Sequence, residues 1–128
     1  MEKLDYDLTA CLEYNQQKEF NVSDIVRVLA VVEGEHDGGD WFWVLKLKGS
    51  RRFAVLQGWC DHTGWDCQSS ACSVITKTAL DACKATGRYQ EKTAGIQSAL
   101  EKQVKAGKKS LTWQEQKDDE FKEFPRRS

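Results

Sequence analysis

The chain has 128 residues and a formal net charge of −1, with 19 lysines and arginines against 20 aspartates and glutamates. This balance disfavours nucleic acid as a partner, and no apolar run approaches the ~20 residues that a membrane-spanning helix needs. The first residues also lack the basic start and apolar stretch of a secretory signal. We therefore expect a single cytoplasmic domain over residues 1–128 that does not enter a membrane.

The cysteine content agrees with this compartment. An odd number of cysteines without a signal peptide argues against an extracellular disulfide framework and for reduced thiols. The five cysteines are Cys11, Cys60, Cys67, Cys72 and Cys83.

The first half of the chain has the patterns of one short helix and three strands. Leu8, Cys11 and Leu12 recur at helical spacing, which predicts an amphipathic helix over about residues 7–16. Three segments rich in β-branched or alternating apolar residues follow, and short turns separate them. These segments predict an antiparallel meander with strands at residues 25–32, 41–48 and 52–59.

The second half has helical periodicity. Ser70 as a cap and Gly87 as an end predict a helix over residues 70–87, and a second helix is expected to end at Gly107. Thr112 and Glu115 form a capping box for a last helix that runs to about residue 124. The expected class is α+β, a three-stranded antiparallel meander with helices packed on one face and mostly C-terminal. The sheet core is expected at about 25–60, a motif loop at 58–70 and the helical part at 70–124.

The motif loop has the most unusual composition of the chain. It combines two tryptophans, two cysteines, two aspartates and a histidine between a strand and a helix, where a plain connection needs no indole or thiol. Its sequence is Gly58-Trp59-Cys60-Asp61-His62-Thr63-Gly64-Trp65-Asp66-Cys67-Gln68-Ser69-Ser70.

Together with Asp40-Trp41 upstream, the motif loop resembles a family of small bacterial and phage proteins without an assigned activity. Their shared string reads approximately Gly-(Gly)-Cys-Asp-Tyr-Thr-Gly-Trp-Asp-Cys-Gln-Ser, and the resemblance covers about residues 24–72. This chain departs from the string at Trp59 and His62, where glycine and tyrosine are expected. The resemblance implies a site in the loop without naming its chemistry.

Two interpretations of the loop involve no metal or redox chemistry. In the first, it binds a protein partner or a small ligand, with Trp59 and Trp65 as contact anchors, because tryptophan is enriched at binding hot spots. Polar groups would then orient the ligand, and they are Asp61, Thr63, Asp66 and Gln68. In the second interpretation, the tryptophan rings fill the junction between sheet and helices, and the cysteines pack as small apolar residues.

Two further interpretations use the thiols. Thiolate and imidazole ligands suit a tetrahedral zinc ion, but the spacing contains no Cys-x-x-Cys pair. The four candidate ligands are Cys60, His62, Cys67 and Cys72. Alternatively, Cys60 and Cys67 could form a reversible dithiol, with the pKa of Cys67 lowered by the start of the predicted helix at residue 70.

The sequence contains no recognisable nucleophile elbow, phosphate-binding loop or metalloprotease motif. Of the four interpretations, we favour the first and expect a non-enzymatic binding or accessory protein that binds no cofactor and uses the loop for recognition. A zinc-binding or thiol-dependent enzyme based on Cys60 and Cys67 is the alternative.

Overall fold

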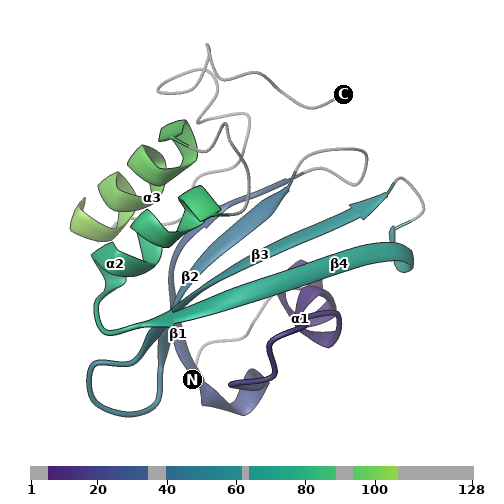
Figure 1. Ribbon diagram of the computed structural model, residues 1–128, viewed down its shortest axis with the longest axis horizontal. Helices are drawn as coiled ribbons and strands as arrows, with labels where there is room; N and C mark the ends of the chain where they lie inside the picture. Colours follow the sequence, from purple (N-terminus) through teal and green to yellow (C-terminus); the bar gives the residue numbers. More distant parts are fainter. Residues whose placement is uncertain (1–5, 35–39, 62–63, 89–93, 107–128) are drawn as a thin grey trace.

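Alternating and β-branched residues form the centre of the fold, as the sequence pattern predicts. The computed structural model describes residues 6–34, 40–61, 64–88 and 94–106. It contains a four-stranded antiparallel sheet in the order β1-β2-β3-β4 (Figure 1). The strands are β1 (Ile25–Val32), β2 (Trp41–Leu47), β3 (Phe53–Asp61) and β4 (Gly64–Thr76). The helices are α1 (Tyr6–Glu13), α2 (Ala79–Lys84) and α3 (Ala94–Ala106), with short 3₁₀ turns η1 (Val22–Asp24) and η2 (Ala85–Arg88).

The α+β class and the meander of β1, β2 and β3 are therefore confirmed. Helices are also found at two of the predicted places, because α1 begins one residue before its expected start and α3 ends one residue before Gly107. The last predicted helix, which begins with the capping box of Thr112 and Glu115, lies outside the described residues.

The prediction of a motif loop at 58–70 is wrong, and the helix predicted over 70–87 is found only at its C-terminal end, as α2 and η2. Instead, β4 runs from Gly64 to Thr76 and pairs with β3 from Ser69↔Cys60 to Thr76↔Phe53. The helical spacing of Cys72 and Ile75 is fortuitous, because backbone pairing with a neighbouring strand outweighs a weak periodicity. The helix begins only after Thr78, whose side chain accepts a hydrogen bond from the Asp81 amide at 3.0 Å.

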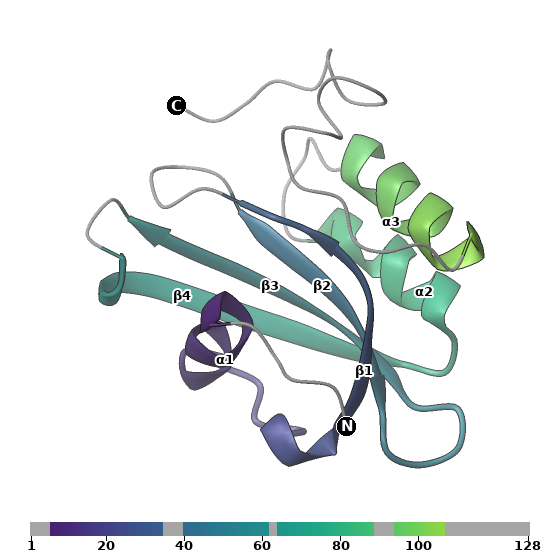
Figure 2. The ribbon, with the colours of Figure 1, turned by 180° about the vertical axis from the view of Figure 1, so that it is seen from behind.

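Helices cover both faces of the sheet, not one face as predicted. In Figures 1 and 2, α1 lies on one side of the sheet and α2 and α3 lie on the other. Because successive side chains of a strand point to opposite faces, β2 and β3 contribute to a core on each side. The core under α1 includes Leu8, Cys11, Trp41, Trp43, Leu56, Cys60 and Trp65. The core under α2 and α3 includes Ala30, Phe42, Val44, Val55, Cys83, Ile96 and Leu100.

No helix in the described part of the chain combines the length and the apolar character needed to span a membrane.

Candidate functional site

The centre of the sequence motif forms a four-residue bulge in β4. Cys60 pairs with Ser69 and Asp61 pairs with Gly64, so residues 65–68 of β4 have no counterpart on β3. Gly64 has a φ of +93°, a left-handed conformation that glycine adopts without strain. The bulge changes the direction of the next side chain, which is that of Trp65.

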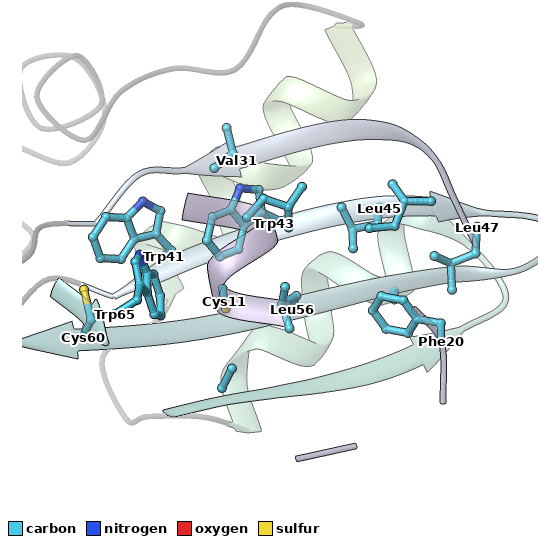
Figure 3. Close-up of a cluster of buried hydrophobic side chains, with 14 residues drawn as sticks. Cys11, Phe20, Val31, Trp41, Trp43, Leu45, Leu47, Leu56, Cys60 and Trp65 are labelled. Carbon is cyan, nitrogen blue, oxygen red and sulfur yellow. The ribbon is translucent and has the colours of Figure 1, made fainter. Parts of the chain in front are cut away.

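Trp65 points into the core under α1, so the prediction that it is an exposed contact anchor is wrong. Its side chain is 1% exposed. Its ring lies 5.3 Å from that of Trp41 and 6.5 Å from that of Tyr14, measured between centroids. Figure 3 shows Trp65 against Trp41 at one end of this core, with Cys60 in the same cluster. For this residue, the interpretation in which the ring fills the core is the correct one.

The polar edge of the Trp65 indole is also satisfied. Its Nε1 donates a hydrogen bond to the Asp7 carboxylate of α1 at 2.9 Å. A buried indole N–H normally finds such a partner, because leaving it unpaired costs about 1–3 kcal/mol. The Nε1 of buried Trp43, by contrast, has no acceptor among the described residues. The motif therefore fastens α1 to the sheet through one ring and one hydrogen bond.

Gly58, the first residue of the motif, allows α1 to approach the sheet closely. A Cβ atom at this position would lie 2.2 Å from the Sγ of Cys11 and 3.0 Å from Cη2 of Trp65. Real Cβ atoms do not come this close to other heavy atoms, so only glycine fits between the Cys11 thiol and the indole. Gly58, Cys11 and Trp65 thus form one packing unit.

Trp59 differs from Trp65 because it belongs to the opposite face of the sheet. It pairs with Ser70, and the neighbouring pair on this face is Gln57 with Cys72. Ser70 is exposed, and the other three side chains are half-buried. In Figure 1, α2 and α3 lie over one end of the sheet, and the ends of β3 and β4 next to residues 62–63 extend beyond them. We call Gln57, Trp59, Ser70 and Cys72 the β3–β4 face.

The β3–β4 face has a largely neutral, polar character. The thiol of Cys72 lies 3.5 Å from Oε1 of Gln57 and donates a hydrogen bond to it across the strand pair. This contact fixes the side-chain amide of Gln57 on the face that also carries the Trp59 indole. Sequence reasoning had not singled out Gln57, although its place two residues before Trp59 on a strand puts both side chains on one face.

The remaining polar candidates fall outside the described residues in whole or in part. Thr63 and His62 lie in the undescribed connection. Asp61, Asp66, Cys67 and Gln68 belong to strands, but only their backbone is described. Their predicted roles as orienting groups or ligands stay predictions.

The four-ligand zinc site is not formed. Cys60 packs in the core under α1, whereas Cys72 contacts Gln57 on the other face. Cys72 pairs with Gln57, and Gln57 lies three positions before Cys60 on β3. Side chains three positions apart on a strand point to opposite faces, so Cys60 and Cys72 lie on opposite faces of the sheet. Cys60 and Cys72 cannot bind one ion while the sheet is intact. Within the described part of the chain, no group of three or more histidine, cysteine, aspartate or glutamate side chains could hold a metal ion.

The argument for a reactive dithiol also loses its electrostatic support. No helix begins at residue 70, so Cys67 does not precede a helix N-terminus that would lower its pKa. Its predicted partner Cys60 is fully buried. Cys11 and Cys83 are fully buried as well, which leaves Cys72 as the partly exposed thiol among the four free cysteines of the described residues.

Burial makes two of these thiols hard to ionise. The pKa of Cys83 is raised from 9.0 to about 12, chiefly because burial disfavours the thiolate and also because Glu101 carries a like charge. The pKa of Cys11 is raised as well, mainly by burial and further by Cys72, Cys60 and Asp7. Such thiols act as small apolar core residues, not as nucleophiles.

These raised pKa values predict a loss of stability in alkali. Above pH 9 the unfolded chain releases the Cys83 proton while the folded chain keeps it up to about pH 12. The free energy of unfolding therefore falls as the pH rises through this window. Urea denaturation at pH 7, 9 and 10 is expected to give a shallower fall for Cys83→Ala than for the unmodified protein. Identical slopes for the two proteins would contradict the assignment.

Sequence reasoning missed the residues that hold Trp65. Asp7 and Tyr14 lie in or next to α1, and the helical stripe of Leu8 and Cys11 was the signal that α1 packs on the sheet. No pattern in the sequence tells which of the five tryptophans meets this helix.

Comparisons with known proteins were made at the level of sequence and of structure. No protein-family model matches the chain, and neither does any curated protein or solved structure. The resemblance of the motif to small bacterial and phage proteins therefore stays a sequence-based prediction.

Proposed function

We propose that this chain is a small, non-enzymatic cytoplasmic binding protein that recognises a protein partner through the β3–β4 face. The observation that carries the proposal is the half-buried indole of Trp59 on the face of the sheet opposite α1. Trp59 lies two residues before the end of β3, and this end of the strand extends beyond α2 and α3 in Figure 1. The sequence analysis predicted both Trp59 and Trp65 as contact anchors, and the proposal keeps Trp59 alone in that role.

The chemistry of the face supports recognition of another protein. Tryptophan offers a large flat contact area at a small entropic cost, and it is enriched among the residues that dominate binding energy. Gln57 and Ser70 lie beside it and can exchange hydrogen bonds with a partner's backbone. All of these groups are on paired strands, which hold them more rigidly than a loop would.

The shared string that the motif resembles also favours a role for Trp59 other than in folding. That string has glycine where this chain has Trp59, so the resemblance implies that the fold does not need a ring there. Trp65, which the string shares, is the ring that the core uses. A half-buried tryptophan that the fold does not require is expected to serve as a contact residue.

The test compares the half-buried Trp59 with an exposed aromatic residue on the opposite side of the sheet. Immobilised protein is used to capture partners from the source cell, with Trp59→Ala as the test variant. Tyr6→Ala is the matched control, because Tyr6 is 67% exposed and belongs to α1 on the other side. We expect a partner that the unmodified protein and Tyr6→Ala both retain and that Trp59→Ala loses at least tenfold.

A second probe avoids mutating the sheet. A bulky maleimide attached to Cys72 places a steric block two residues from Ser70 on the same strand, and it is expected to abolish capture. The proposal is wrong if Trp59→Ala and the Cys72-labelled protein, both folded by circular dichroism, retain the same partners as the unmodified chain.

A further inference from the structure

The outward face of α3 forms one wall of a hollow. A cavity of about 530 Å³ lies along this helix, a size within the range of about 300–1,000 Å³ that is usual for ligand pockets. The described residues that line it all belong to α3, and they are Ser98, Glu101, Lys102, Lys105 and Ala106. A single helix is convex, so these side chains can enclose a hollow only together with a second element.

The lining residues point away from the sheet. To the core under α2 and α3, the helix contributes Ile96, Ala99 and Leu100. On the opposite helical face, Ser98, Lys102 and Lys105 are exposed and recur at the i, i+4, i+7 spacing of one face. The apolar stems of the two lysines and the methyl group of Ala106 provide surface on which a second helix can pack.

The segment that follows α3 lies outside the described residues, but its sequence has the length and the pattern of that second element. Residues 107–111 separate the end of α3 from the capping residue Thr112, and connections of about two to five residues commonly join antiparallel helices. The helix expected over residues 113–124 is nearly as long as α3, which has 13 residues. Its apolar side chains recur at helical spacing, and they are Trp113, Phe121 and Phe124.

The charges of the two surfaces are also complementary. Lys102 and Lys105 place positive charge along the hollow, and the Glu101 carboxylate between them already accepts a hydrogen bond from Gln97 at 3.1 Å. Residues 113–124, by contrast, contain five acidic and two basic side chains, which gives a net charge of −3. An acidic helix with an apolar stripe therefore suits a face of lysine stems and ammonium groups.

We propose that residues 113–124 dock as a helix, antiparallel to α3, in the hollow on its outward face. The short connection at residues 107–111 places Trp113 beside Ala106. Because the two helices run in opposite directions, eight residues forward along the segment correspond to eight residues back along α3, and Phe121 lies beside Ser98. The docked helix covers α3 from the side opposite the sheet, and this contact is independent of the β3–β4 face.

Nuclear Overhauser effects in the full, unmodified chain test the contact directly. We expect cross-peaks between the Phe121 ring and the Ser98 side chain at a concentration where sedimentation velocity shows a monomer. Random-coil chemical shifts in residues 113–124, or helical shifts without a cross-peak to α3, overturn the proposal. The same cross-peaks found only in a dimer also overturn it, because the occupant is then the segment of a second copy.

The variant Phe121→Ala measures what the docked helix contributes to α3. Alanine is the stronger helix former, so a loss of contact cannot be due to loss of the helix itself. A helix packed on α3 must leave before α3 opens, so we expect the Val104 amide to exchange at least about threefold faster in this variant. Lys122→Ala is the matched control on the other face of the segment, and it should leave this exchange unchanged. Equal exchange rates in Phe121→Ala and the unmodified chain overturn the proposal.

Discussion

Replacing Trp65 by alanine is expected to cost about 3–5 kcal/mol of folding stability, the range found when a buried aromatic ring is removed from a core. The ring is 1% exposed and packs against Trp41 and Tyr14. Its loss leaves a cavity between α1 and the sheet, and it also leaves the Asp7 carboxylate without its indole donor. Urea denaturation followed by circular dichroism measures the change in the free energy of unfolding.

The matched control is the other tryptophan of the motif. Trp59→Ala removes the same side chain from a half-buried position on the opposite face, so its loss of stability should be clearly smaller. Trp65→Phe keeps most of the ring but removes the donor to Asp7, and an intermediate loss is expected. If Trp59→Ala and Trp65→Ala were equally destabilising, the division of the motif into a core ring and a surface ring would be wrong.

The second large effect is expected for Gly58→Ala. A methyl group here would lie 2.2 Å from the Sγ of Cys11, which is fully buried. Overpacking of this kind typically costs about 1–3 kcal/mol and sometimes more. We expect a lowered urea midpoint with near-native circular dichroism, because the overpacking destabilises the fold without changing it.

A double-mutant cycle tests the proposed cause of this effect. Cys11→Ala removes the clashing sulfur, after which the nearest atoms to the new methyl group are Cη2 of Trp65 at 3.0 Å and Cβ of residue 11 at 3.4 Å. We therefore expect the double variant to be more stable than the sum of the single losses implies, although not fully restored. Additive losses would mean that the Cys11 thiol is not what excludes a side chain at Gly58.

The regular part of the fold could be predicted from the sequence because its signals are local. The alternation in Trp41–Leu47 and the β-branched run Ile25–Val32 each favour a strand whatever surrounds them. The fourth strand could not be found in this way. Residues 69–76 have a weak helical spacing, and only their pairing with β3 makes them a strand. That pairing is a tertiary contact, which a periodicity does not report.

In the sequence analysis, the two tryptophan rings of the candidate site were treated alike. Trp59 and Trp65 are both flanked by small or polar residues, and the sequence holds no sign that a four-residue bulge lies between their positions on the sheet. The bulge decides the outcome, because it turns Trp65 toward α1 while Trp59 keeps to the other face. The set of four zinc ligands is excluded for a related reason, since Cys60 and Cys72 are close in sequence but lie on opposite faces of the sheet.

The claim on which the function depends is that partners dock on the end of the β3–β4 pair that carries Trp59. Hydrogen exchange measured by mass spectrometry, with and without a captured partner, tests it most directly. We expect the partner to slow exchange in residues 57–60 and 69–72 and to leave peptides of α1 unchanged. Protection confined to α1 or to the outer surface of α3, with no change at residues 57–60, would contradict this account.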